Sequence, residues 1–502
     1  MKLNEKSWLV ILAVIALIYV LLRFWHLADS CLWFDEIFSV HAAEHDWSNL
    51  FSFVAQDLIH PPLFYVFLKI WISIGGESLF WLRFFPVFFS CVALLPFYFL
   101  CRALKLNYPA MALALTFLAF NGALIKYAQE VRMYSLLFCL ALFSMWLFVR
   151  FLHLGKSFWI LTLVNVLLVY THYFGWLVVF SEVVAILILQ RIKIRQTLIM
   201  LLINLAAFAP WIVAVWQASR TSADLAQNIG WIARPNAAAI FQFVFDLIEP
   251  FYFQQSTADP TSLFYISVPI LLIISGATIV YLVDWRNKNE TEKRRFYLLL
   301  IFIKAPIWLA LAGSWLLPHS IWGARHLIIV FAPMAILAAM CIERISIERL
   351  KYGLIALLFL LFGVAFVLQM INAQTKFIWC GWEDLVQHID HGKPQKIYVF
   401  EDLSAYLVWF KLRRDIDVEV TKINIDGLPE DKSYFLPRGF DNVRTTDESG
   451  IIGDKIWIAF RDREFNRSKP PLLNLIEKGY KIGEPETFQA QGSIVFLVQA
   501  EK

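Results

Sequence analysis

Long apolar stretches recur along the first three quarters of the chain and alternate with short polar segments. Eleven of these stretches have the length that a helix needs to cross a hydrocarbon core of about 30 Å. They lie at residues 8–25, 80–101, 109–126, 132–152, 157–174, 175–190, 196–216, 263–283, 296–316, 325–343 and 352–372. The pattern predicts an α-helical polytopic membrane protein with about eleven transmembrane helices.

A further apolar stretch, PPLFYVFLKIWISIGG at 61–76, is too short to count among these spans. A helix of that length would reach only about 24 Å. If it does not span, 17 Lys and Arg side chains before residue 376 fall on one side of the membrane and 7 on the other. This is the positive-inside pattern, so the stretch is expected to lie in the outer interface or to re-enter. The N-terminus is then cytoplasmic and the C-terminus lies outside.

The pattern changes at about residue 376. Alternating segments typical of strands occur as KIYVFED, DVEVTKI, KIWIAFRD and GSIVFLVQA. Segments with helical spacing lie between them, as GWEDLVQHIDHG, SAYLVWFKLRR and PPLLNLIEKGYK. The alternation predicts a small α/β domain at 376–502 on the outer side, after a transmembrane domain at 1–375. The polar loop at 217–262 is expected to be a second outer feature.

The composition agrees with this class, because 59% of the residues are hydrophobic, only 17% are charged and the mean hydropathy is +0.62. A net charge of +4 is too small to indicate a nucleic-acid partner. The six cysteines form no CxxC pair and no spacing typical of metal ligands. Cys31 and Cys380 both fall on the outer side, where a disulfide between them is one option and two free thiols are the other.

The polar residues with the chemistry of a site gather on this predicted outer face, although they come from distant segments. They are Asp35 and Glu36 in the first outer loop, His60 before two prolines, Arg83 at the start of the second span, Glu130 and Arg132 at the fourth, His172 after the fifth, and Arg325 and His326 at the tenth. Lys304 lies in the middle of the ninth span, where an ammonium group needs a partner or water.

Several of these residues also have an ordinary structural explanation. Asp35 is a suitable N-cap for an interfacial helix over 37–45, and Glu36 taken alone is a solvated acid. The three arginines at span ends could extend to the interface, although outer arginines oppose the positive-inside trend. His172 stands among aromatic residues and fits an interfacial belt.

His60 precedes two prolines, and proline is favoured in the first turn of a helix. The sequence therefore predicts His60 at the cap of a helix, beside the free N–H groups and the positive end of the dipole. Such a place suits an anion, and a lipid phosphate is the natural anion at this depth. The alternative is a histidine that only caps a re-entrant helix.

Arginine and histidine side chains neutralise phosphate, and a nearby carboxylate open to the outside can accept a proton from a hydroxyl group. If the lipid phosphate carries a sugar, its departure develops negative charge that fixed cations stabilise. The set predicts transfer of a sugar from a polyprenyl-phosphate donor to an external acceptor. In this mechanism Asp35 removes the proton, and His60, Arg83, Arg132 and Arg325 hold the phosphate.

The segments LWFDEIFSVHAA, HPPLFYVFLKIW, QEVRMYS, THYFG and RHLIIVFAPMAIL occur in an order that resembles the GT-C membrane glycosyltransferases. Within them the sequence is most similar to the protein O-mannosyltransferase and lipid A aminoarabinose transferase group, over about residues 1–375. The resemblance implies that Asp35, with Glu36 beside it, is the catalytic base. It also implies that His60, Arg83 and Arg325 contact the donor phosphate. His326 stands where a tyrosine is commoner.

The resemblance further implies a glycosyltransferase of hexosyl or pentosyl groups in the bacterial inner membrane. Its donor would be a polyprenyl-phosphate sugar, and its acceptor a periplasmic glycan, lipid or protein. Some members carry another acid in the fourth span, for which Glu130 is the candidate here. No cofactor is required in this branch, with a divalent metal as the alternative. A flippase or a non-catalytic binder of lipid-linked sugars is the rival interpretation, and Lys304 is the residue that favours it.

Overall fold

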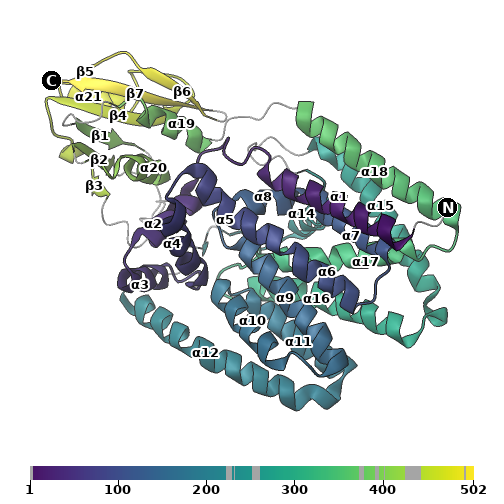
Figure 1. Cartoon of the computed structure of the whole chain (residues 1–502). Helices are drawn as coiled ribbons and strands as arrows, with labels where there is room; N and C mark the ends of the chain where they lie inside the picture. Colours follow the sequence, from purple (N-terminus) through teal and green to yellow (C-terminus); the bar gives the residue numbers. More distant parts are fainter. Residues whose placement is uncertain are drawn as a thin grey trace.

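A computed structural model gives the fold of the chain, a large bundle of helices with a smaller sheet-containing part at the C-terminal end (Figure 1). The structure describes residues 4–221, 229–230, 232–251, 261–371, 378–389, 395–400, 402–415, 417–423, 443–490 and 493–502. The expected outer loop at 217–262 therefore lies partly outside the described residues.

The helices of the bundle follow one another through the first 371 residues. Among the described residues they are α1 (Glu5–Phe24), α2 (Phe34–Glu44), α3 (Trp47–Asp57), α4 (Leu63–Gly75), α5 (Leu79–Val92), α6 (Leu94–Ala103), α7 (Tyr108–Phe120), α8 (Gly122–Gln129), α9 (Tyr134–Leu154), α10 (Phe158–Thr171), α11 (Gly175–Leu189), α12 (Ile194–Thr221), α14 (Ala237–Asp246), α15 (Thr261–Val283), α16 (Glu290–Leu316), α17 (Phe331–Glu343) and α18 (Glu348–Ile371).

Eight segments among the described residues are long and apolar enough to cross a membrane. They are Glu5–Phe24, Leu79–Ala103, Tyr134–Leu154, Arg191–Arg220, Tyr265–Val283, Glu290–Leu316, His326–Glu343 and Glu348–Ile371. The three other expected spans correspond to the shorter apolar helices α7, α10 and α11. The stretch 109–126 is shortened because the side chain of Asn121 accepts a hydrogen bond from the backbone N–H of Leu124 and begins α8. The polytopic α-helical class is confirmed, and eight of the eleven expected spans correspond to segments of full spanning length among the described residues.

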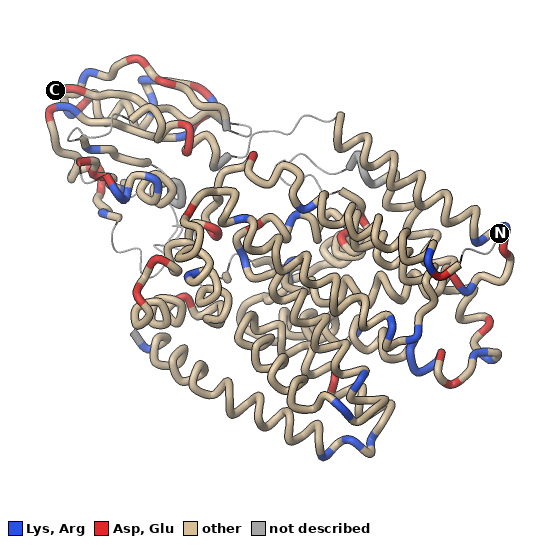
Figure 2. Tube along the Cα trace, in the orientation of Figure 1, with Lys and Arg blue, Asp and Glu red and all other residues tan. Residues whose placement is uncertain are grey.

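Charged side chains lie mostly near the ends of the long helices, and the middle stretches carry few of them (Figure 2). This distribution suits a lipid environment, because an unpaired charge in the middle of a bilayer is unfavourable. Lys304 is an exception: it lies on the exposed face of α16 and makes no hydrogen bond or ion pair with another described residue. It stands apart from the other candidate residues.

Inside the bundle, a buried polar network joins three neighbouring helices. Glu182 of α11 accepts a hydrogen bond from Ser144 of α9 (2.7 Å) and another from the amide of Asn165 of α10 (2.7 Å). All three side chains are fully buried. Because polar groups in an apolar interior need partners, this network fixes how α9, α10 and α11 pack.

The C-terminal part forms a seven-stranded sheet in the order β3-β2-β1-β4-β7-β5, with β6 on β7. The strands are β1 (Gln395–Val399), β2 (Val418–Ile423), β3 (Arg444–Thr446), β4 (Lys455–Asp462), β5 (Lys481–Ile482), β6 (Glu486–Ala490) and β7 (Ser493–Glu501). Strands β1 to β4 are parallel where they pair, whereas β7 is antiparallel to its neighbours. Its helices are α19 (Ile378–Val386), α20 (Asp402–Leu412) and α21 (Leu472–Glu477). The expected small α/β fold is confirmed.

A disulfide joins the two parts of the chain. Cys31, just before α2, is bonded to Cys380 of α19, and their Cα atoms are 5.3 Å apart. Of the two options that the sequence leaves open, the structure has the disulfide. The C-terminal part is thereby attached to the segment that leads into α2.

The buried network makes a prediction about stability. Glu182→Ala removes the acceptor of two buried donors, and an unsatisfied buried polar group costs about 1–3 kcal/mol. We expect the melting temperature in detergent to fall by roughly 5 °C, and Glu182→Gln to cause a smaller fall because it keeps a carbonyl acceptor. Lys304→Ala on the exposed face of α16 is the control and should melt like the wild type. Equal melting of Glu182→Ala and wild type would show that the network does not stabilise the bundle.

Candidate functional site at the first turn of α2

The carboxylate of Asp35 lies between two arginines. One of its oxygens, Oδ2, is 3.9 Å from an Nη atom of Arg132 and 3.7 Å from one of Arg325. These distances are ion pairs without a direct hydrogen bond. The Asp35 and Arg325 side chains are 26% and 23% exposed. A carboxylate and a guanidinium group are therefore both accessible at one point.

Asp35 is not the N-cap of the helix that follows it. The helix α2 begins at Phe34, with Trp33 as its N-cap, so Asp35 is already in the first turn. The alternative in which Asp35 caps a helix over 37–45 is therefore wrong. The backbone N–H of Trp33 instead donates to the carboxylate of Glu36 (3.1 Å). The side chain of Asp35 therefore does not cap the helix, and it lies within ion-pair distance of Arg132 and Arg325.

Glu36 lies beside Asp35 in the sequence but in a different environment. Its side chain is fully buried. Besides Trp33, it accepts hydrogen bonds from Arg83 of α5 (3.2 Å) and from the backbone N–H of Val131 (2.9 Å). Glu36 is therefore not the solvated acid of the alternative reading. It ties α2 to α5 and to the loop before α9.

The guanidinium of Arg83 is likewise occupied by protein groups. It donates to the carbonyl oxygens of Leu27 (3.2 Å) and Cys31 (2.8 Å) in addition to Glu36. The residue is buried. Arg83 thus holds the segment between α1 and α2, and it does not extend to an interface.

Arg132 connects the loop before α9 with α2 and with His60. It donates to the backbone carbonyl of Asp35 (3.1 Å) and to Ser39 (3.2 Å), and its second Nη atom lies 3.2 Å from Nε2 of His60. The residue is buried, and the neighbouring carboxylate of Asp35 raises its pKa although burial opposes this. Arg132 therefore places a permanent positive charge beside the carboxylate of Asp35.

His60 does not occupy the helix cap that the sequence predicts. The helix α4 begins at Leu63 and its N-cap is Pro62, so His60 lies two residues further back. Its Nδ1 is 3.0 Å from the carboxylate of Asp57, and its Nε2 faces Arg132. A cation cannot accept from an arginine, so Nε2 carries the lone pair and Nδ1 the proton. Burial and the charge of Arg132 lower the pKa of His60 well below its ordinary value, which agrees with a neutral ring.

Two further histidines continue from His60 in a row of rings. The centroids of His60 and His172 are 5.8 Å apart, and those of His172 and His326 are 5.1 Å apart. His172 accepts a hydrogen bond from the backbone N–H of Phe174 (3.0 Å), and burial lowers its pKa. Nδ1 of His326 is buried without a hydrogen-bond partner among the described residues. The structure thus brings His172 and His326 to the site, although His172 also has the aromatic neighbours expected of a belt residue.

Sequence reasoning missed two tyrosines and an acid near this cluster, and a further buried acid beyond α14. The rings of Tyr127 and Tyr134 pack against each other at 5.1 Å, and Tyr134 lies 6.3 Å from the ring of His326. Asp57 fixes the proton of His60, as described above. Glu249, beyond α14, has a buried oxygen without a partner among the described residues, and burial raises its pKa to about 8. Tyr134 lies within the segment QEVRMYS, and Asp57 stands three residues before His60, but neither residue type indicates a role at that position. Tyr127 and Glu249 lie outside the quoted segments.

Glu130, the secondary acid expected near the fourth span, lies in the loop between α8 and α9. Its nearest cation is Lys126 at 4.0 Å, and its second oxygen is buried without a hydrogen-bond partner among the described residues. Burial raises the pKa of Glu130 to about 7. At neutral pH this carboxyl group is therefore close to half protonated.

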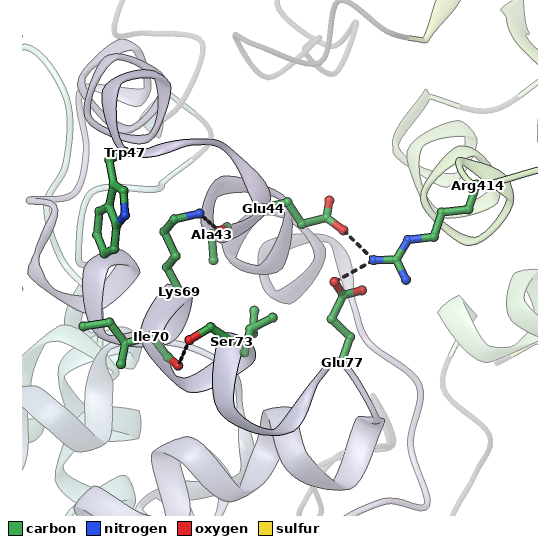
Figure 3. Close-up of a pocket in the computed structure, with 9 residues that line it drawn as sticks. Ala43, Glu44, Trp47, Lys69, Ile70, Ser73, Glu77 and Arg414 are labelled. Atoms are coloured by element: carbon green, nitrogen blue, oxygen red, sulfur yellow. Dashed lines mark hydrogen bonds and ion pairs between the residues drawn. The ribbon is translucent and has the colours of Figure 1, made fainter.

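A separate cavity of about 500 Å³ opens at the C-terminal end of α2 (Figure 3). Glu44, Trp47, Lys69, Glu77 and Arg414 are among the residues around it. None of the residues around Asp35 lines it. No group of three or more His, Cys, Asp or Glu side chains in the described part of the chain has the arrangement of a metal site.

The raised pKa of Glu130 gives a prediction about pH. The folded protein keeps this proton up to about pH 7, whereas the unfolded chain releases it near pH 4.5, so the folded state loses stability as the pH rises through this window. Glu130→Gln removes that loss. We expect its melting temperature to rise relative to wild type between pH 5 and pH 8, while the exposed control Glu290→Gln stays parallel to wild type. A difference that does not change with pH would show that Glu130 is ionised throughout.

Comparison with known proteins supports the fold of the whole chain. No family model and no curated protein matches the sequence. Among solved structures, ArnT from Cupriavidus metallidurans bound to undecaprenyl phosphate is similar, with a TM-score of 0.61 at 12% identity over 99% of this chain and 98% of that one. Its apo state gives a TM-score of 0.59 at 12% identity over 98% of each chain. At this identity the likeness concerns the fold, and the chain has the GT-C fold that its motifs resemble.

Proposed function

We propose that this protein is a membrane glycosyltransferase that moves a sugar from a polyprenyl-phosphate donor to an acceptor hydroxyl group. The observation that carries the proposal is the accessible carboxylate of Asp35 between Arg132 and Arg325. An accessible base with one accessible cation, Arg325, and one buried cation, Arg132, beside it suits a reaction in which a hydroxyl loses a proton and a phosphate departs. The similarity to ArnT, which was solved with undecaprenyl phosphate bound, supports a donor of this kind.

In the proposed reaction, Asp35 accepts the proton of the acceptor hydroxyl, and the oxygen attacks the sugar carbon that carries the phosphate. The bond between this carbon and the phosphate oxygen breaks, and the polyprenyl phosphate leaves with the electron pair. Arg325 and Arg132 stabilise the negative charge of the leaving phosphate. The products are a glycosylated acceptor, polyprenyl phosphate and protonated Asp35.

Three of the other residues expected at the site, Glu36, Arg83 and His60, are proposed to act by positioning the catalytic residues. The carboxylate of Glu36 and the two Nη atoms of Arg83 are engaged by protein groups, so we assign both residues to positioning α2 and not to contact with substrate. His60 positions Arg132 in the same way, because both of its ring nitrogens have partners. His172, His326 and Glu130 border this cluster and remain candidates for contact with the donor, whereas Lys304 lies elsewhere. No metal is needed for any of these steps.

We also propose that the site faces the outside of the bacterial inner membrane. The positive-inside pattern supports an outer position for α2 and the C-terminal part. The disulfide between Cys31 and Cys380 supports this orientation, because disulfides persist in oxidising compartments such as the periplasm. A glycan, lipid or protein of the periplasm would then be the acceptor.

The catalytic role of Asp35 is testable in a reconstituted assay. Purified wild-type protein and Asp35→Asn would receive radiolabelled undecaprenyl-phosphate sugars, with crude cell-envelope extract as acceptor. We expect the wild type to release undecaprenyl phosphate and Asp35→Asn to do so about 10²–10⁴ times more slowly, with donor binding kept. Arg325→Gln should instead weaken donor binding. Donor that binds both proteins but stays intact would favour the flippase or the non-catalytic binder.

Cysteine labelling tests the proposed orientation. Ser449→Cys places a thiol on the exposed surface of the sheet-containing part, and Lys156→Cys places one in the exposed loop between α9 and α10. In intact spheroplasts, a maleimide that cannot cross membranes should label the first variant at once and the second only after permeabilisation. The reverse order would place the site in the cytoplasm.

A further inference from the structure

Helix α2 lies alongside α20 of the C-terminal part over most of its length. The ring of Phe34 packs on that of Tyr406 at 6.0 Å, and His41 packs on Trp409 at 5.1 Å. From the first of these contacts to the second, the chain runs in the same direction along both helices. Phe34 directly precedes Asp35, and this packing therefore begins next to the proposed base.

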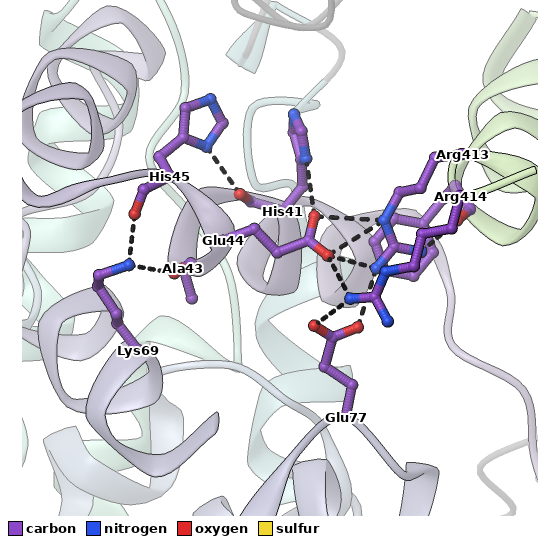
Figure 4. Close-up of polar contacts among 9 residues, drawn as sticks. His41, Ala43, Glu44, His45, Lys69, Glu77, Arg413 and Arg414 are labelled. Atoms are coloured by element: carbon purple, nitrogen blue, oxygen red, sulfur yellow. Dashed lines mark hydrogen bonds and ion pairs between the residues drawn. The ribbon is translucent and has the colours of Figure 1, made fainter. Parts of the chain in front are cut away.

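An ion cluster continues the contact at the far end of α2 (Figure 4). Nε of Arg413, just after α20, donates to Glu44 at the end of α2 (3.1 Å), and one of its Nη atoms donates to Glu77 (2.9 Å). His41 also lies 3.2 Å from the Glu44 carboxylate. The Arg413 side chain is 13% exposed, whereas its neighbour Arg414 is 70% exposed. The less exposed Arg413 therefore contributes more to holding α2 than Arg414.

The Glu44 carboxylate keeps its charge at ordinary pH. Burial alone would raise the pKa of Glu44, but hydrogen bonds from His41 and Arg413 and the charge of Arg413 lower it to about 2. Glu44 is therefore ionised over the physiological range. The same end of α2 is also held by Lys69 of α4, which donates to the backbone carbonyls of Ala43 and His45 (Figure 4).

The disulfide secures the opposite end of α2. Cys31 stands four residues before Asp35, and its partner Cys380 belongs to α19. The backbone N–H of Cys31 also points to the sulfur of Cys380 at 3.2 Å. The C-terminal part thus contacts α2 covalently before its first turn, through aromatic rings along its side and through Arg413 at its end.

This support matters because α2 has only 11 residues, a length at which an isolated helix is marginal in water. The distances from Asp35 to Arg132 and Arg325 depend on where the first turn of α2 lies. A displacement of about 1 Å at a reacting group can slow a reaction by about 10²-fold.

We propose that the C-terminal domain is a positioning element for the proposed active site, and that Arg413, through Glu44, fixes α2 so that Asp35 meets the arginines at the right distance. The inference rests on the proposed function for its effect on turnover. Arg413 and Glu44 are positioning residues, because neither touches the cluster around Asp35. The domain then contributes to the rate of transfer.

The first test measures α2 itself and needs no substrate. Hydrogen exchange would be followed by mass spectrometry in peptides covering 31–46, in full-length wild type, Arg413→Gln and the double variant Cys31→Ser with Cys380→Ser. We expect both variants to exchange at least fivefold faster in α2. Arg444→Gln is the matched control, since Arg444 is an exposed arginine of the same domain whose ion-pair partner, Glu419, also belongs to that domain. Unchanged exchange in Arg413→Gln would overturn the proposal.

The second test separates positioning from general destabilisation. In the transfer assay, Arg413→Gln should lower kcat about tenfold, while binding of undecaprenyl phosphate stays within twofold of wild type. Arg413→Lys keeps the charge and should restore part of kcat, and Arg444→Gln should equal wild type. Faster exchange in α2 with unchanged kcat would show that the contact does not position Asp35. A wild type that turns over no donor would contradict the proposed function instead, and the exchange data alone would then decide whether Arg413 fixes α2.

Discussion

The fully buried carboxylate of Glu36 is the constraint on which the geometry of the site depends. A buried charge is tolerated only when it is paired and hydrogen-bonded, and removing one partner of such a pair costs about 3–5 kcal/mol. Its donors come from Trp33, Arg83 and Val131, in three different segments. Satisfying this one carboxylate therefore fixes α2 against α5 and against the loop that carries Glu130 and Arg132.

Once that arrangement is fixed, burial divides the charged residues by role. Glu36 and Arg83 form an ion pair inside the protein, and both Nη atoms of Arg83 are hydrogen-bonded to protein oxygens. Asp35 and Arg325 keep about a quarter of their side chains exposed, and they are the groups that a substrate can reach. Arg132 belongs to both sets, because it bonds α2 and also places its charge beside Asp35. The site thus consists of a few accessible groups on a support of buried ion pairs.

The sequence predicts the helices and strands well because hydrophobic runs and alternation depend on local chemistry. It also predicts which charged residues share one face. It does not separate the roles of Asp35 and Glu36, since two adjacent acids look alike until one is buried under partners from distant segments. The placement of His60 fails for the same reason: the rule for prolines at helix starts places it at a cap, whereas Asp57 and Arg132 decide its position. The partner of Cys31 is 349 residues away, which no local pattern reveals.

This long separation shows how the two parts of the chain depend on each other. The segment from Cys31 to Glu44 lies near the N-terminus. Its disulfide partner Cys380, the helix α20 that packs on it and Arg413 at its end all follow residue 376. Without those later contacts, Phe34 and His41 would lose their packing against Tyr406 and Trp409 of α20. The hydrogen bonds of Glu36 hold α2 against α5 and the loop before α9, and α20 holds it through the rings of Phe34 and His41. A carboxylate that must stay within ion-pair distance of two arginines benefits from being held from both directions.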